Sequence, residues 1–371
     1  MAFYRRIFMR FCKTIFFWGL MSLGLGLTLG STQVSPSEST PQASRKVKGR
    51  FVNTSQTPHT QEEVSKVMDR AEFLTNRLWT AATQDAKTEP SMPVATPDLA
   101  FLKSGHQGPS FTWLGHATCL VQIKGQTFLT DPHFSERASP VSFIGPKRLF
   151  PSPISLTQLP HIDVVVISHS HYDHLDLPTL RQLSQQPGGS PLFLVPLELK
   201  GWMQAKGLTR TEELDWWQTL EHQGVRYTLV PAHHWSMRTL WNRNETLWGG
   251  WVVRSDDFKF YFTGDTGYAD LFPQIARLGP FDLSAIAIGA YEPRGFMKVH
   301  HINPEEAVRI HQDVGSRYSV GIHWGTFRLS SEALLQPPRD LSRALEQRRV
   351  DPKSFITLPP GETLRFPPPR P

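Results

Sequence analysis

A strand-like apolar run that ends in a cluster of metal-ligand residue types limits the folds open to this chain. Residues 163–168 read DVVVIS, and four consecutive β-type apolar residues are typical of a strand buried on both faces. Residues 168–176 then read SHSHYDHLD. Four of these nine residues are the candidate metal ligands: His169, His171, Asp173 and His174. The pattern predicts a β-sheet with a metal site at its edge, the alternative being a polar loop.

Three later apolar runs also lead into a histidine or an aspartate. RYTLV precedes PAHHW, FKFYF precedes TGDTGY, and YSV precedes GIHWG. The candidates in these loops are His234, Asp265 and His323. One such residue alone is usually a turn or capping residue, but four loops with imidazole or carboxylate groups match what zinc accepts. Because the first cluster cannot complete two tetrahedral sites alone, the four loops together predict a dinuclear metal site.

The remaining patterns predict many short strands with helices between them. The segment 303–314, NPEEAVRIHQDV, has a capping asparagine at Asn303, a proline in the first turn and Glu306 at the third helical position. Two β-rich halves that meet somewhere after Trp251 would suit a sandwich of two sheets with helices outside.

The first 90 residues differ in composition from the rest. Residues 1–30 combine four basic residues and no acid with the apolar run TIFFWGLMSLGLGLTLG, which predicts a cleaved signal peptide or an N-terminal membrane anchor. YRRIFMR resembles a twin-arginine export signal, although ordinary arginines of a secretory signal are the alternative. Either interpretation places the body outside the cytoplasm, in a periplasm or on the outer face of a membrane, with residues 14–30 as the anchor if the segment is not cleaved.

Two further segments separate this leader from the predicted catalytic domain. Residues 31–60 are rich in Ser, Thr, Pro and Gln and are predicted to be a disordered tether. Residues 61–90 carry an apolar stripe and are predicted to be helical. The formal net charge of +6 falls to +2 without the four basic residues of the leader, so the charge does not indicate nucleic-acid binding.

The motifs carry a family resemblance. The H-x-H-x-D-H cluster with the later His, Asp and His resembles the metallo-β-lactamase superfamily. Strings between about residues 90 and 360 resemble one family more narrowly, N-acyl-phosphatidylethanolamine-hydrolysing phospholipase D: TWLGHAT, TDPHFSERASP, ISHSHYDHLD, HHWSMRTL, FTGDTGY, IGAYEPRGFMK, INPEEAVRIH and IHWGTF. This resemblance implies an α/β (α+β) fold over residues 91–365, an αββα sandwich of two mixed sheets with helices on the outer faces.

The same resemblance implies roles for individual residues. It places His169, His171 and His234 on one Zn²⁺, and Asp173, His174 and His323 on a second. It makes Asp265 the bridge between the ions and selects His234 over His233 because the ligand precedes a tryptophan. It also implies that His301 faces the substrate phosphate and that Tyr172 lines the same cleft, whereas His300 is expected at the surface.

Two further positions are expected near the site. Asp131 in LTDPHF is expected to hydrogen-bond a ligand histidine, with a turn carboxylate before Pro132 as the alternative. Gly295 stands where a bulky aromatic is expected in animal members, which implies a wider or differently shaped cleft near His301.

The implied reaction is hydrolysis of N-acyl-phosphatidylethanolamine-like lipids to N-acylethanolamine and phosphatidic acid. A hydroxide shared by the two zinc ions would attack phosphorus, with Asp173, Asp265 and His301 as the catalytic residues. The expected partner is a phospholipid at a membrane surface; nucleic acid is not expected, and no oligomeric partner is predicted. The alternatives are a zinc-dependent lactonase or other acyl hydrolase of the superfamily, and a non-catalytic surface protein.

Overall fold

The computed structural model describes residues 42–55, 92–105 and 108–367, which all belong to one structural unit, Pro41–Pro371. The expected signal or anchor at 1–30 and the expected helical segment at 61–90 therefore lie outside the described residues. Among the helices that are described, none is long and apolar enough to cross a bilayer.

The first sheet has seven strands in the order β16-β3-β4-β5-β6-β7-β8. Strands β16 to β5 pair antiparallel, and β5 to β8 pair parallel. The strands are β3 Ser110–Gly115, β4 Thr118–Ile123, β5 Gln126–Thr130, β6 Val164–Val166, β7 Leu192–Pro196, β8 Thr211–Leu214 and β16 Thr363–Arg365.

The second sheet also has seven strands, in the order β15-β14-β13-β12-β11-β10-β9. It divides in the same way, with antiparallel pairs from β9 to β12 and parallel pairs from β12 to β15. The strands are β9 Thr219–His222, β10 Val225–Val230, β11 Gly250–Arg254, β12 Lys259–Phe262, β13 Phe281–Ala287, β14 Ser316–Ile322 and β15 Phe355–Ile356.

The central strands are apolar throughout because both of their faces are covered. In β6, Val164 and Val166 point into the core between the sheets, whereas Val165 points into a second cluster on the outer face. All three valines are fully buried, and each contributes about 1.5–3 kcal/mol of burial free energy. The alternation also fixes the register, since a shift by one residue would exchange the two faces.

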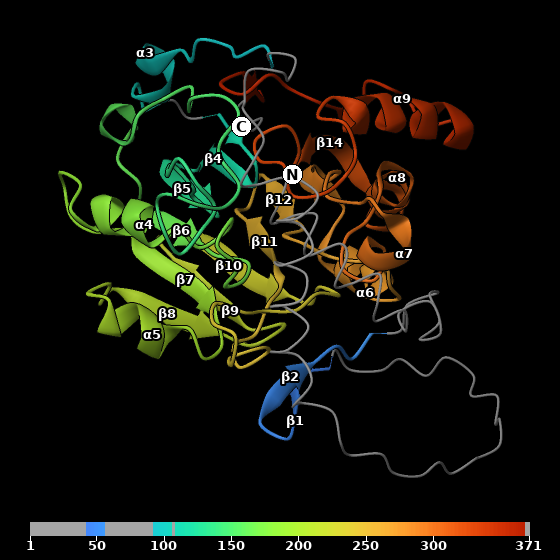
Figure 1. The fold of residues 1–371 in the computed structure, drawn as a ribbon. Helices are drawn as coiled ribbons and strands as arrows, with labels where there is room; N and C mark the ends of the chain where they lie inside the picture. Colours follow the sequence, from blue (N-terminus) through green and yellow to red (C-terminus); the bar gives the residue numbers. More distant parts are fainter. Residues whose placement is uncertain (1–41, 56–91, 106–107, 368–371) are drawn as a thin grey trace, which may run out of the picture. The chain divides into compact units, whose positions relative to one another are not determined.

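Helices cover the outer face of each sheet, with α4 and α5 on one side and α8 and α9 on the other (Figure 1). The helices are α3 Leu99–Leu102, α4 Leu177–Ser184, α5 Lys200–Ala205, α6 Phe272–Ile275, α7 Arg294–Met297, α8 Pro304–Asp313 and α9 Gln336–Arg348, with 3₁₀ turns η3 Leu156–Gln158 and η4 Ala276–Leu278. The expected αββα sandwich of two mixed sheets is therefore confirmed.

The start of α8 agrees with the sequence signal in detail. The Asn303 side chain accepts a hydrogen bond from the Glu306 backbone N–H at 2.9 Å, and the Glu306 carboxylate accepts from the Asn303 N–H at 3.0 Å. This capping box satisfies two backbone donors that the first turn would otherwise leave unpaired.

Two expectations need correction. The two β-rich halves meet between Leu214 and Thr219, where the chain passes from β8 to β9, and not after Trp251, which lies within the second sheet. The predicted tether at 31–60 contains an antiparallel hairpin, β1 Arg45–Val47 and β2 Arg50–Val52. The polar composition of this segment gives no sign of the hairpin. The hairpin packs on the domain through Phe51, which is only 3% exposed and lies in the core between the sheets.

Candidate metal centre

The predicted ligands lie at the ends of strands from both sheets. The loop after β6 carries His169, His171, Asp173 and His174, whereas His234 follows β10, Asp265 follows β12 and His323 follows β14. Gly264 shows how tightly the loops approach: a Cβ there would stand 2.8 Å from the Ser168 Cβ, at a φ of +57°. The structure thus brings all seven predicted ligands to one edge of the sandwich.

One group of donors consists of His169, His171 and His234. The His169 Nε2 lies 2.7 Å from the His171 Nδ1, and the His234 Nε2 lies 3.4 Å from the same Nδ1. Burial holds the pKa of His169 and of His234 well below the usual value and lowers the pKa of His171 to about 3. Three buried nitrogens of neutral imidazoles that face one another match the ligand set of a metal ion.

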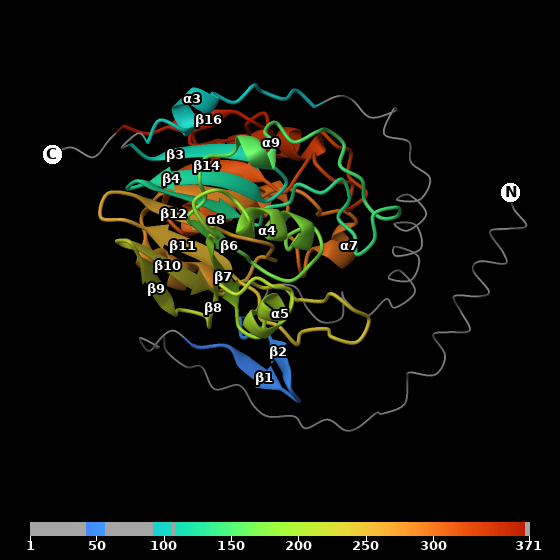
Figure 2. The same cartoon turned by 90° about the vertical axis from the view of Figure 1, so that its left-hand side faces the viewer.

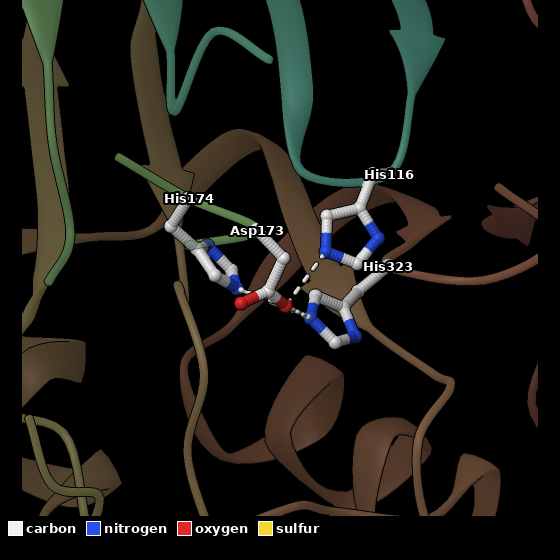
Figure 3. Close-up of side chains that lie close together, drawn as sticks. All are labelled: His116, Asp173, His174 and His323. Atoms are coloured by element: carbon white, nitrogen blue, oxygen red, sulfur yellow. Dashed lines mark hydrogen bonds and ion pairs between the residues drawn. The ribbon is translucent and has the colours of Figure 1, made fainter. Parts of the chain in front are cut away.

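A second group contains the predicted ligands Asp173, His174 and His323 and an additional histidine, His116 (Figure 3). Their ligand atoms all lie within 4.8 Å of one another. The Asp173 Oδ2 lies 3.3 Å from the His174 Nε2 and 3.5 Å from the His323 Nε2. Its shortest contact is with the His116 Nε2, at 3.0 Å. The sequence reasoning did not single out His116.

Asp265 lies between the two groups. Its Oδ2 is 3.2 Å from the His174 Nε2, 3.8 Å from the His234 Nε2 and 3.9 Å from the His169 Nε2. Its Oδ1 is 3.1 Å from the His323 Nε2. A single carboxylate that reaches histidines of both groups has the placement that a bridging ligand needs.

The electrostatics of the edge favour bound positive charge. Burial alone would raise the pKa of Asp265, but the charges and hydrogen bonds of His174 and His323 hold that pKa well below its usual range. Burial also opposes protonation of His323, yet Asp265 and Asp173 raise the pKa of His323 to about 9. Two buried carboxylates thus require cations beside them, and metal ions can take the place of these protons.

Asp131 stands behind the ligands, where the sequence placed it. It is fully buried and accepts hydrogen bonds from the Ser168 N–H at 2.7 Å, the Ser168 hydroxyl at 2.5 Å and the His174 Nδ1 at 2.7 Å. Because the Nδ1–H of His174 is engaged by a carboxylate, its Nε2 is left with the lone pair that a metal ligand needs.

Unusual backbone conformations occur at this edge. His116, Asp131 and His323 have positive φ angles of 53°, 36° and 62°. Residues other than glycine rarely adopt such angles, and when they do they cluster at functional sites. The chain therefore turns sharply at the three points where it presents a side chain to the centre.

The hairpin β1–β2 supports the centre through a residue that the sequence reasoning missed. The Asn53 side chain donates to the His234 carbonyl at 2.9 Å and accepts from the His234 N–H at 3.2 Å. The neighbouring His233 contacts the Ser55 hydroxyl at 2.8 Å instead of the metal cluster. A contact over such a sequence separation gives no local signal.

Tyr172 points toward the loop after β10 instead of into the donor groups. Its hydroxyl donates to the Arg238 carbonyl at 3.0 Å, and the Arg238 guanidinium lies 4.1 Å from the centre of its ring. Arg238 also donates to the carbonyls of Ser170 and Leu175 at 2.9 and 2.8 Å, which holds the ligand loop in place. A substrate contact by Tyr172 stays a prediction.

His301 lies beside Asp265, with a side chain that is 16% exposed and an Nδ1 that is 3.8 Å from the Asp265 Oδ2. Arg294 fixes its backbone by donating to the His301 carbonyl at 2.9 Å, while its other nitrogen pairs with Glu306. His300 is not the surface residue that was expected: it is half-buried, and its carbonyl accepts from the His234 Nδ1 at 2.9 Å.

Gly295 and three tryptophans, Trp216, Trp248 and Trp241, differ in how far they are exposed. A Cβ on Gly295 would meet no atom within 4 Å, so this position is open and could accept a larger side chain. Trp216 and Trp248 are core residues, and the Trp216 Nε1 donates to the Trp248 carbonyl at 2.6 Å. Trp241 differs, since it is 80% exposed.

The residues present fit two metal ions. Apart from His116, each group offers three nitrogen or carboxylate donors, with Asp265 shared between them, and the His171 Nε2 is buried without a hydrogen-bond partner among the described residues. The first ion would be held by His169, His171 and His234, and the second by Asp173, His174 and His323.

Comparisons with known proteins agree with this geometry. A family model described as the beta-lactamase superfamily domain matches residues 126–324. The N-acyl-phosphatidylethanolamine-hydrolyzing phospholipase D 1 of Caenorhabditis elegans is 46% identical over 264 residues, which cover 68% of this chain and 74% of the relative. An uncharacterized protein of Mycobacterium tuberculosis is 40% identical over 279 residues, 74% of each chain.

A solved structure shows the same fold at lower identity. A metallo hydrolase from Ignicoccus hospitalis superposes with a TM-score of 0.53 at 19% identity, over 70% of this chain and 99% of that one. The chain therefore belongs to the N-acyl-phosphatidylethanolamine-hydrolysing phospholipase D family of the metallo-β-lactamase superfamily, and it is a metal-dependent hydrolase.

Proposed function

We propose that the protein is a dinuclear zinc phosphodiesterase of phospholipase D type. Its substrates would be N-acyl-phosphatidylethanolamine-like lipids, and its products N-acylethanolamine and phosphatidic acid. The observation that carries the proposal is the pairing of two donor groups around Asp265 with the partly exposed His301 beside it, in a chain 46% identical to a relative with that named activity.

The donor types favour zinc. The first group is made of three imidazoles, and the proposed ligands of the second, Asp173, His174 and His323, are two imidazoles and a carboxylate. Imidazole nitrogens suit zinc better than they suit calcium or magnesium, which take oxygen ligands. When bound, the two ions would lower the pKa of water toward neutrality and neutralise charge that develops on the phosphate oxygens.

Side chains near the metal ions would bind the phosphate, donate a proton and support the ligand loop. His301 is partly exposed and lies beside Asp265, so its ring could hydrogen-bond a phosphate oxygen or donate a proton to the leaving alkoxide. The backbone contacts from Arg294 hold that ring in position. Arg238 would keep the ligand loop in place beneath the substrate through its bonds to Ser170 and Leu175.

A phospholipid surface is the proposed partner, and two exposed apolar loop tips support it. Leu240 and Trp241 are 82% and 80% exposed, and Phe143 is 80% exposed. The segments 236–246 and 139–145 both project on the side of the sandwich where α7 lies (Figure 2). Arg50 donates to the Trp241 carbonyl at 3.0 Å, which places a cation beside this tip. Tryptophan and arginine together suit the headgroup region of a bilayer.

Export across the inner membrane is proposed on sequence grounds alone, from the basic and apolar residues of 1–30. The protein would then act in the periplasm or on the outer face of a membrane, where it would meet lipid from the aqueous side.

The test is an assay of the zinc-loaded full chain on vesicles that contain N-acyl-phosphatidylethanolamine, beside a panel of lactones. Mass spectrometry should find N-acylethanolamine and phosphatidic acid in equal amounts. The variant His301→Ala should keep its zinc and lose about 10²–10⁴-fold in rate, as expected for loss of a general acid. Turnover of lactones alone would refute the phosphodiesterase and support the acyl hydrolase.

A further inference from the structure

His116 lies in the turn between β3 and β4 and is a buried member of the second donor group. It is 1% exposed, and its Nε2 lies 3.0 Å from the Asp173 Oδ2. An ionised carboxylate only accepts hydrogen bonds, so the His116 Nε2 must carry the proton in this contact. The contact therefore uses His116 as a donor, and its Nδ1 has no partner among the described residues.

The backbone of His116 is tied to the other side of the same group. Its carbonyl accepts from the His323 N–H at 2.9 Å and from the Trp113 Nε1 at 2.9 Å. Its own N–H donates to the Thr326 hydroxyl at 2.6 Å, and its ring lies 4.0 Å from the ring of His323. His116 thus contacts one ligand from the loop after β6 and another from the end of β14.

We propose that His116 is a positioning residue for the second metal ion. Its Nε2–H would hold the Asp173 carboxylate in the orientation that presents an oxygen to the ion, and its carbonyl would hold the backbone of His323. The two ligands come from different sheets, so one residue that contacts both sets the distance between them. This inference rests on the metal centre and is independent of the lipid substrate.

Two substitutions separate positioning from a merely structural role. In His116→Gln the side-chain amide N–H₂ can occupy the place of Nε2 and still donate to Asp173. In His116→Asn the amide is one bond closer to the backbone, at the place of Nδ1, and cannot reach Asp173. The backbone preference is the reverse, because asparagine tolerates the φ of +53° better than glutamine does. If His116 acts only through its backbone conformation, the Asn variant should therefore keep more metal than the Gln variant. If His116 positions Asp173, the Gln variant should keep more metal.

The experiment measures bound metal in the full chain, with zinc and with Co²⁺ as a spectroscopic probe. Elemental analysis should find two metals per chain in the wild type and in His116→Gln, and about one in His116→Asn. The affinity of the second site should fall about 10–100-fold in the Asn variant, as for loss of a residue that orients a ligand. The Co²⁺ absorption bands of the second site should change in the Asn variant only.

The matched controls are the same two substitutions at His311, a buried histidine whose Nδ1 contacts the Ser319 hydroxyl at 2.8 Å, away from the centre. Both should leave the metal content unchanged. Loss of the second metal in both His116 variants would make His116 a ligand, and retention in both would make it dispensable. Retention in Asn with loss in Gln would indicate a backbone role, so each of these three results overturns the proposal.

Discussion

Replacing Asp131 with asparagine should weaken the second metal site without disturbing the loop that holds it. Asparagine accepts the positive φ at this position and matches the aspartate in size. Asp131 uses its oxygens to accept from the Ser168 N–H, the Ser168 hydroxyl and the His174 Nδ1. Asparagine has only one oxygen, and its N–H₂ group must take the place of the other.

The substitution should change which ring nitrogen of His174 carries the proton. If the asparagine carbonyl keeps the Ser168 N–H, its N–H₂ group faces the His174 Nδ1, which must then accept. The proton of His174 would move to Nε2, the atom that lies 3.2 Å from Asp265 and must bind the metal. Loss of such an orienting contact costs about 10–100-fold in metal affinity, which is about 1.4–2.7 kcal/mol.

The assay is competition for zinc between the protein and a chromophoric chelator, with stoichiometry from elemental analysis. The control is Asp163→Asn at the other end of β6, where the carboxylate accepts from the Thr127 N–H at 2.8 Å and is remote from the centre. Two zinc ions bound to Asp131→Asn with the affinity of the wild type would show that His174 does not depend on Asp131 for its tautomer.

Three other changes have expected outcomes. Asp265→Ala should lose both metals and all turnover, because one carboxylate contacts both donor groups; elemental analysis that still finds two ions would exclude the bridging role. Leu240→Ser with Trp241→Ser should reduce protection of segment 236–246 from hydrogen exchange on vesicles while leaving metal content unchanged; equal protection would refute docking through this tip. Burial lowers the pKa of His311 from 6.5 to about 4, so the neutral form is favoured in the folded state. In the metal-free chain, the stability that depends on neutral His311 should be complete above pH 6.5 and fall by about 3 kcal/mol as the pH falls to 4, and urea titrations of His311→Gln should show a shallower decline over this range.

The sequence predicts much of the centre because its ligands follow apolar strands directly. The runs before His169, His234, Asp265 and His323 are the strands β6, β10, β12 and β14. A buried strand has a continuous apolar pattern, and a polar residue at its end stands out against that pattern. The apolar pattern of a buried strand thus makes the ligand at its end recognisable in the sequence.

Contacts that depend on distant parts of the chain were not predictable in this way. His116 lies inside the run FTWLGHATCLVQI, which has the composition of one long strand, although the chain reverses there between β3 and β4. The only local signal is the Gly-His pair, because glycine at 115 has a φ of +109°. Asn53 gives no local signal, since its partner His234 is 181 residues away.

The ligands of each proposed metal ion come from both sheets, so metal binding should stabilise the packing of one sheet on the other. Each proposed metal ion joins ligands of the loop after β6, in the first sheet, to a histidine of the second sheet, His234 in one case and His323 in the other. An ion bound in this way stabilises only the state in which the two sheets are packed together, by RT ln(1 + [metal]/Kd), or about 2.7 kcal/mol at a hundredfold excess over Kd. Metal removal should therefore loosen the packing between the sheets at this edge first, while the strands at the opposite edge, which lack ligands, keep their protection from hydrogen exchange.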